Sequence, residues 1–188
     1  MRIVAGKWAG RHLTSPMDRR VRPTAEHVRD AWLRRLQPDL AGARILDLFA
    51  GTGALGLEAM SRGARSADFV ETRPASLHAL KANVAALHVR ERTRIFKKDA
   101  LPFAEALPIA RYDIAFADPP YESRMLDRLL DGWMERPFAA ILTIEHSSRH
   151  LLPEGGEEFF FEDTMITTYR ARLADLRRAE EEEEEDRG

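Results

Sequence analysis

The chain has 188 residues, of which 44% are hydrophobic and 32% are charged, a composition that suits one compact domain and leaves little room for a second. No run of about 18 apolar residues occurs and the N-terminus lacks a long apolar region, so we expect neither a membrane span nor a signal peptide. Cysteine is absent, which excludes disulfides and thiolate zinc sites and is typical of a cytoplasmic protein.

Charge is distributed unevenly along this chain, whose formal net charge is −2. Residues 175–188 carry eight acidic and three basic side chains, and we expect this acidic tail to be disordered. Residues 1–36 carry nine basic and three acidic side chains. A basic N-terminal arm predicts a nucleic-acid partner, and an arginine-rich face exposed to solvent is the alternative interpretation.

The predicted elements begin with two extended pieces that form a small hairpin and a helix that ends near Leu36, with Thr24 as its N-cap. Pro38 and Gly42 are expected to break the chain after this helix. Strands and helices then alternate, which predicts a parallel sheet, and two further strands form a closing antiparallel pair. The extended pieces are 2–4 and 11–14; the strands are 44–49, 66–71, 93–97, 112–117 and 139–145; the helices are 54–62, 74–87, 101–107 and 122–135; the closing pair is 157–162 and 165–173.

A glycine-rich turn follows the strand at 44–49 and leads into the next helix. Gly51 and Gly53 permit a tight turn and close approach of a ligand to the backbone, and Gly56 lets the helix pack against the strand. The spacing fits a dinucleotide as well as S-adenosylmethionine. Asp47 favours the second ligand, because a carboxylate at the strand end holds an ammonium group and repels a pyrophosphate.

Four carboxylates fall at the carboxyl ends of predicted strands: Asp47, Glu71, Asp99 and Asp118. In open α/β sheets the ligand binds beyond these ends of the strands. The sequence therefore predicts a pocket along this edge.

Asp118, Pro119, Pro120 and Tyr121 follow the strand at 112–117. The prolines leave backbone carbonyls open as acceptors, and Tyr121 can stack on a flat base. A carboxylate and a carbonyl that accept from an exocyclic amine would localise its lone pair toward an electrophile, which indicates methyl transfer to nitrogen. A turn that merely closes the strand is the structural alternative.

Residues 47–58 resemble the first motif of class I S-adenosylmethionine-dependent methyltransferases, and residues 118–121 resemble the fourth motif of their amino-methylating members. Segments 2–6, 10–13, 22–24 and 28–30 are similar to the RsmD-type family, bacterial methyltransferases that act on guanine N2 in 16S ribosomal RNA. The resemblance covers about residues 1–173.

The resemblance implies a Rossmann-like α/β fold, with a mostly parallel seven-stranded sheet, helices on both faces and a small N-terminal hairpin and helix. The expected parts are a basic RNA-contacting extension at 1–40, an S-adenosylmethionine-dependent methyltransferase domain at 41–174 and the acidic tail at 175–188. The expected cofactor is S-adenosyl-L-methionine, without metal. The expected partner is 16S ribosomal RNA, in the small subunit or an assembly intermediate, and we expect a cytoplasmic monomer.

The resemblance also assigns roles to individual residues. Glu71 accepts hydrogen bonds from the ribose hydroxyls, Asp99 accepts from the adenine amino group, and the segment at 22–24 folds over the site as a lid. The catalytic residues are Asp118, Pro119, Pro120 and Tyr121; the cofactor-binding residues are Asp47, Phe49, Gly51, Gly53, Glu71, Thr72, Asp99, Ala100 and Asp118; the RNA-binding and lid residues are Arg2, Lys7, Arg11, Arg22, Pro23, Thr24 and Arg29.

Two other functions stay open at this point. One is amino-methyl transfer to DNA adenine N6 or protein glutamine N5, and the other is a non-catalytic RNA-binding assembly factor. The histidines show no ligand spacing for a metal, so Glu145 and His146 are expected to be structural or to line the pocket. Trp32 and Trp133 are expected in the core, whereas Trp8 either packs in the hairpin or stacks on RNA.

Overall fold

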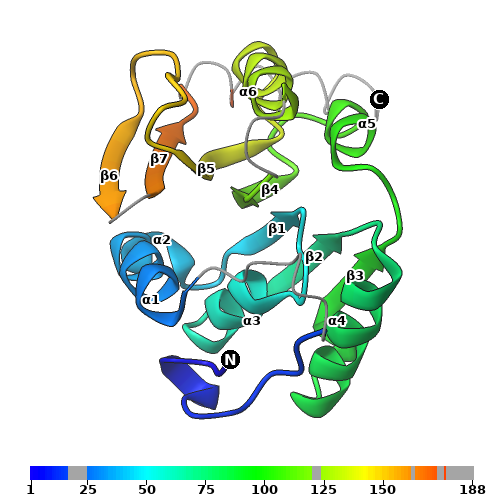
Figure 1. Cartoon of the computed structure of the whole chain (residues 1–188). Helices are drawn as coiled ribbons and strands as arrows, with labels where there is room; N and C mark the ends of the chain where they lie inside the picture. The colour runs from blue at the N-terminus through cyan, green and yellow to red at the C-terminus, as the bar shows by residue number, and fades with distance from the viewer. Residues whose placement is uncertain (17–24, 120–123, 162–163, 173–175, 177–188) are drawn as a thin grey trace. The chain divides into compact units, whose positions relative to one another are not determined.

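The computed structural model describes residues 1–16, 25–119, 124–161, 164–172 and 176 (Figure 1). The chain forms two compact units, Met1–Ala100 and Leu101–Gly188. In the described part of the chain, no helix is long and apolar enough to cross a membrane.

The first unit contains three parallel strands. In it β2 (Ser66–Val70) lies between β1 (Arg44–Leu48) and β3 (Thr93–Phe96). Parallel neighbours need a crossover, and helices α3 (Ala54–Ser61) and α4 (Pro74–Ala86) provide the two crossovers. All but the first residue of both β1 and β2 are buried, which explains their nearly continuous apolar sequences.

The first part of the N-terminal arm, residues 1–14, folds as the predicted hairpin within this unit. The amide of Ile3 donates to the carbonyl of Arg11, and the amide of Leu13 donates to the carbonyl of Met1, both at 2.9 Å. A single antiparallel bridge joins Arg2 to His12. The short 3-10 helix η1 (Gly6–Trp8) lies at the turn of the hairpin, and a second one, η2 (Arg90–Arg92), precedes β3.

Two expectations about the N-terminal helices need correction. Helix α1 (Glu26–Arg35) has Ala25 rather than Thr24 at its N-cap, and Thr24 lies outside the described residues. The chain continues into a one-turn helix, α2 (Gln37–Leu40), where a break at Pro38 was expected. Proline is well suited to a first helical turn, because its missing N–H would have no intrahelical partner there.

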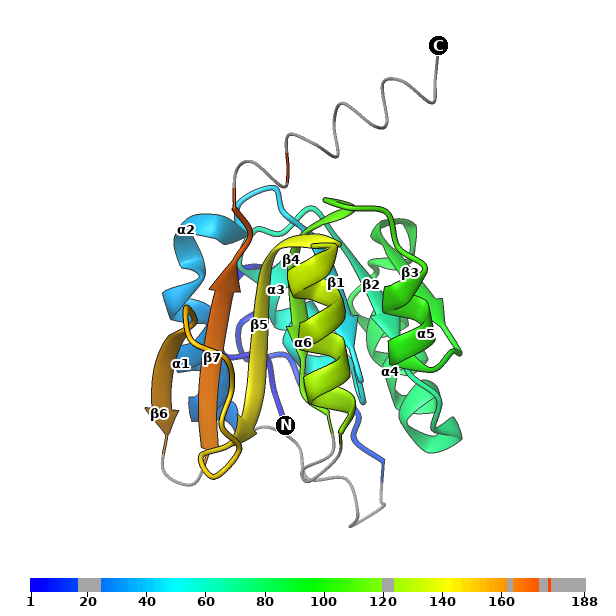
Figure 2. The same cartoon turned by 90° about the horizontal axis from the view of Figure 1, so that it is seen from above.

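The second unit contains four strands, in the order β4 (Tyr112–Ala117), β5 (Ala139–Ser147), β7 (Thr164–Arg170) and β6 (Glu157–Phe161). Strands β4 and β5 are parallel, and the pairs β5–β7 and β6–β7 are antiparallel. Helix α5 (Ala100–Glu105) leads into this unit, and α6 (Met125–Glu135) connects β4 to β5 and runs alongside them (Figure 2).

The predicted core tryptophans and the structural pair are confirmed. Trp32 and Trp133 are buried, and the Trp133 indole N–H donates to the Ala139 carbonyl at 2.9 Å. Glu145 and His146 on β5 are held by β7, because Thr164 donates to Glu145 and His146 Nε2 lies 2.8 Å from the Thr167 hydroxyl. Burial lowers the pKa of His146, which keeps this ring neutral at physiological pH.

Candidate functional site

The three glycines of the turn after β1 serve different purposes. Gly51 and Gly53 adopt φ angles of +56° and +75°, which glycine tolerates without a steric penalty. A Cβ added to Gly53 would lie 2.3 Å from Leu80 Cδ1, and one added to Gly56 would lie 2.6 Å from Phe69 Cε1. A Cβ on Gly51 would meet its nearest atom only at 4.0 Å. Packing therefore requires Gly53 and Gly56, whereas Gly51 faces open space.

The backbone is strained where β1 enters this turn. Phe49 has a φ of 61°, a left-handed conformation that is unfavourable for a bulky side chain. Such strain costs on the order of 1–3 kcal/mol and persists where the surrounding structure enforces it, often at ligand sites. Phe49 was assigned to the cofactor set from the sequence, and its conformation fits that assignment.

Glu71 joins the end of β2 to the glycine turn. Its Oε2 accepts from the Gly51 amide at 2.8 Å, and its Oε1 accepts from the amides of Thr72 and Arg73 at 2.8 Å. Burial raises the pKa of Glu71, but hydrogen bonds from Arg73, the charge of its guanidinium and the Gly51 amide together lower it. The buried carboxylate is therefore ionised, and its hydrogen bond to the Gly51 amide holds the glycine turn in place.

Asp47 caps the helix that follows the turn. The side chain is buried, and its Oδ2 accepts from the amide of Gly56, the third residue of α3, at 3.0 Å. The first amides of a helix have no intrahelical acceptor and attract negative charge. Asp47 and Glu71 thus occupy two of the N–H groups that a pyrophosphate would need, which disfavours a dinucleotide in this turn.

The other cofactor residues of the first unit lie at the same edge of its strands. Glu71 donates its amide to the Phe96 carbonyl at 3.1 Å, so the ends of β2 and β3 lie side by side. Asp99 follows β3 by three residues and is exposed, while Ala100 is the buried first residue of α5. Because β1, β2 and β3 are parallel, Gly51, Glu71 and Asp99 lie along one edge.

Asp118 and Pro119 belong to the second unit, where they directly follow β4. Asp118 is partly exposed and Pro119 is buried. Pro120 and Tyr121 lie outside the described residues.

The predicted RNA-binding residues occupy contrasting environments. Arg2 pairs with Glu26 at 3.1 Å, and Lys7 and Arg11 are exposed. Arg29 is fully buried and forms an ion pair with Glu58 at 3.3 Å. The expectation that Arg29 contacts RNA is therefore wrong, because its guanidinium is used inside the protein. Arg22, Pro23 and Thr24 lie outside the described residues.

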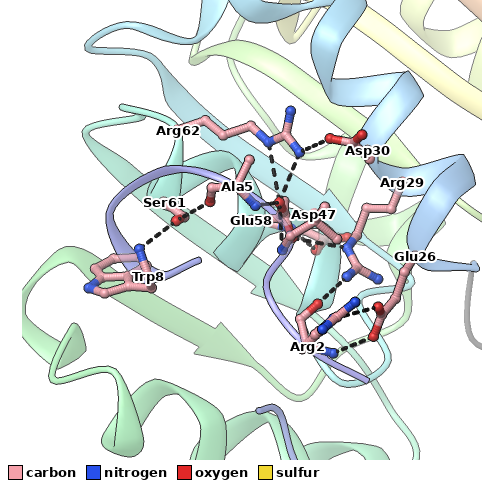
Figure 3. A network of polar contacts seen from close by, with 12 residues as sticks. Arg2, Ala5, Trp8, Glu26, Arg29, Asp30, Asp47, Glu58, Ser61 and Arg62 are labelled. Carbon is pink, nitrogen blue, oxygen red and sulfur yellow. Dashed lines mark hydrogen bonds and ion pairs between the residues drawn. The ribbon is translucent and has the colours of Figure 1, made fainter. Parts of the chain in front are cut away.

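A buried carboxylate that sequence reasoning missed organises the N-terminal arm. The two carboxylate oxygens of Glu58 on α3 accept from the amides of Val4 and Ala5 at 2.9 Å and from Arg62 at 2.9 Å (Figure 3). Arg62 in turn donates to Asp30 on α1 at 2.7 Å. The signal in the sequence was a charged residue inside a helix whose other residues are nearly all apolar or small.

A second missed residue connects the arm to the glycine turn. Asn83 on α4 is buried, accepts from the Thr14 amide at 2.7 Å and donates to the carbonyls of Thr14 and Thr52, both at 3.0 Å. The hairpin and the turn therefore share one side-chain amide.

Known proteins resemble this chain along most of its length. The family described as Conserved hypothetical protein 95 matches residues 1–165. Ribosomal RNA small subunit methyltransferase D of Escherichia coli K12 is 34% identical over 158 residues, which cover 81% of this chain and 78% of that protein. The Haemophilus influenzae protein of the same name is 28% identical over 177 residues, covering 90% and 92%. The solved structure of yhhF from Escherichia coli has a TM-score of 0.79 and 30% identity, covering 92% and 98%.

The matched region spans the glycine turn, the strand-end carboxylates and Asp118. The likeness to yhhF confirms the predicted Rossmann-like α/β fold with seven strands. The chain therefore belongs to the RsmD family of class I S-adenosylmethionine-dependent methyltransferases.

Proposed function

We propose that this protein transfers the methyl group of S-adenosylmethionine to the exocyclic N2 of a guanine in the 16S ribosomal RNA of the small subunit. The observation that carries the proposal is Asp118-Pro119 directly after β4, in a chain whose relatives are named ribosomal RNA small subunit methyltransferases. A carboxylate in this position suits an amine substrate. In the first unit, the basic arm provides cations for RNA phosphates, and the glycine turn gives the cofactor access to the backbone.

The cofactor is held along the edge of β1, β2 and β3. Glu71 accepts from the ribose hydroxyls, using the lone pairs that the Arg73 guanidinium now occupies at 3.2 Å. Arg73 can give way because its side chain is half exposed, whereas the amides on Glu71 remain. Asp99 accepts from the adenine amino group, and Gly51 gives the methionine part access to the backbone. The remaining cofactor contacts are with Asp47, Phe49, Gly53, Thr72, Ala100 and Asp118.

Asp118 acts on the amine that receives the methyl group. Its carboxylate and the Pro119 carbonyl accept hydrogen bonds from the two N–H groups, which localises the nitrogen lone pair toward the electrophilic methyl carbon. S-adenosylmethionine supplies an electrophilic methyl group, and its C–S bonding pair returns to sulfur. The nitrogen then releases one proton to Asp118 or to water. Because base pairing hides the N2 edge, the target guanine lies in a loop or is turned out of its helix.

The test is transfer of labelled methyl from S-adenosylmethionine to small ribosomal subunits isolated from cells that lack this protein, followed by nucleoside analysis. The expected product is N2-methylguanosine at one site. Labelling of DNA or protein in place of the subunits would refute the proposal in favour of another amino-methyl transfer. Cofactor binding without transfer to any of these substrates would instead indicate an assembly factor.

Two substitutions separate the proposed roles. Asp118→Ala is expected to bind S-adenosylmethionine nearly normally, because the other cofactor contacts remain, and to lose transfer by on the order of 10²-fold or more, because Asp118 acts chiefly on the amine. Glu71→Gln is expected to weaken cofactor binding, since it removes the charge that holds Gly51. If Asp118→Ala lost cofactor binding and Glu71→Gln kept it, the role of Asp118 on the substrate amine would be wrong.

A further inference from the structure

Cations of the N-terminal arm divide into two groups. Arg2, Arg29 and Arg34 are each held by a carboxylate within the protein. Lys7 and Arg11 are exposed and have no ion pair with any residue that the structure describes. Among the described residues, fewer cations of the arm are therefore available to a partner than a count of its basic side chains indicates, and Lys7 is one that is available.

Two of the exposed cations meet at one indole ring. Lys7 Nζ lies 6.0 Å from the centroid of the Trp8 ring, and Arg92 Cζ, from η2, lies 5.9 Å from it. Arg92 is exposed and, among the described residues, has no carboxylate partner; neighbouring Glu91 is also exposed and does not pair with it. Like charges on one ring repel each other, so an anion at this place would stabilise the cluster.

Trp8 anchors the cluster and does not itself offer a stacking face. The residue as a whole is 9% exposed, and its amide donates to the Ser61 hydroxyl at 2.9 Å (Figure 3). Ser61 is fixed in turn, because its hydroxyl donates to the Ala5 carbonyl at 2.6 Å. A buried ring leaves little area on which a nucleobase could stack. Of the two expected roles of Trp8, packing in the hairpin is therefore the one that the structure supports. The ligand chemistry that remains for the cluster is an anion held by Lys7 and Arg92.

The cluster lies at the opposite edge of the strands from the cofactor residues. Arg92 directly precedes the first residue of β3, and Ser61 ends α3, which returns the chain to the start of β2. Gly51, Glu71 and Asp99 follow the other ends of these strands. Strands of four or five residues span about 15 Å at roughly 3.3 Å per residue, so the two places lie at least that far apart.

We propose that Lys7 and Arg92, both placed beside the buried Trp8 ring, form a second RNA contact, which binds backbone phosphates at the amino-terminal edge of β2 and β3. This inference rests on the proposed function, because it assumes an RNA substrate. With the rise of double-helical DNA, about 3.4 Å per nucleotide of one strand, as a guide, an RNA that reaches both edges spans roughly five nucleotides or more. The substrate is then an RNA that extends several nucleotides beyond the target nucleotide.

The test compares the affinity of Lys7→Glu, Arg92→Glu and the double variant for 16S ribosomal RNA transcribed in vitro, across a range of salt concentrations. Losing one phosphate contact lowers the salt slope by about one and weakens binding about fivefold at 0.15 M salt, and the double variant loses about 30-fold. The control is Arg136→Glu, which reverses an exposed arginine of the second unit. Cofactor affinity and Tm are expected to stay at the wild-type values.

Affinities and salt slopes equal to those of Arg136→Glu would overturn the inference. If a variant unfolds, Arg92→Gln decides, because it removes the charge without introducing a carboxylate and must weaken RNA binding about fivefold for the inference to stand. Methyl transfer by the wild-type protein is measured in parallel. If the wild-type protein transfers methyl groups but the Lys7 and Arg92 variants bind RNA with unchanged affinity, only the second contact is rejected. If these variants lose salt-dependent RNA binding but the wild-type protein transfers no methyl group, only the proposed function is rejected.

Discussion

Replacing Glu58 by glutamine removes the charge on which the N-terminal arm depends, while its shape is nearly kept. The carboxylate lies between Arg29 and Arg62, whose side chains are 0% and 3% exposed. Glutamine keeps one acceptor oxygen and places an NH2 group where the other carboxylate oxygen accepts, so it satisfies fewer of the backbone and guanidinium donors around it. The variant therefore leaves buried guanidinium charge uncompensated and part of the converging N–H groups without an acceptor.

The expected loss of stability is large for a single substitution. Breaking a buried ion pair by removing one partner costs about 3–5 kcal/mol. For a protein of this size each kcal/mol shifts Tm by about 2–4 °C, so we expect Tm to fall by roughly 6–20 °C. Thermal unfolding followed by circular dichroism measures this shift. Tryptophan fluorescence reports on the arm at the same time, because Trp8 is held beside Ser61 on the same helix as Glu58.

Glu26→Gln is the matched control, since it removes the other carboxylate that holds the arm. Its ion pair with Arg2 is exposed, with side-chain exposures of 36% and 61%, and exposed pairs contribute under about 1 kcal/mol. We expect a change in Tm of no more than about 4 °C. Equal, small shifts in the two variants would refute the reasoning that burial makes Glu58 the stabilising residue.

Three further changes test the turn, its anchor and the second unit. Gly53→Ala places a Cβ against Leu80 at a φ of +75°, and we expect about 2–4 kcal/mol of destabilisation in urea unfolding; unchanged stability would contradict the packing argument. Asn83→Asp removes the donor to Thr52 and is expected to cost about 1–3 kcal/mol in the same assay, so a neutral result would exclude a stabilising role for this link. Burial depresses the pKa of His146 below 6.5 in the folded protein, so its contribution to stability is present above pH 6.5 and is lost as pH falls through the folded pKa. His146→Gln is expected to flatten the fall in stability between about pH 7.5 and 5.5, and an unchanged pH profile would show that another group is responsible.

The strands and most helices were predictable because each depends on local sequence. The apolar stretch at 112–117 coincides with β4, since a buried parallel strand requires apolar residues on both faces. The later strands differ more at their ends: β5 continues to Ser147, beyond the predicted end at 145, and β7 ends at Arg170, before the predicted end at 173. Helix α2 was missed because Pro38 breaks a helix interior but favours a first turn, and the sequence alone does not say which position it occupies.

The sequence by itself determined the order of elements, the glycine turn and the carboxylates at strand ends, because spacing along the chain encodes all three. Tertiary structure alone decided how the charges are used. Arg29 looks like an RNA-binding residue until Glu58, 29 positions away, is found against it in the interior. The link between Asn83 and Thr14 joins residues 69 positions apart. Side chains so distant in sequence meet only when the sheet and its crossovers bring them together. Once these groups are buried, each charge or amide needs its partner, because a buried polar group without one costs free energy.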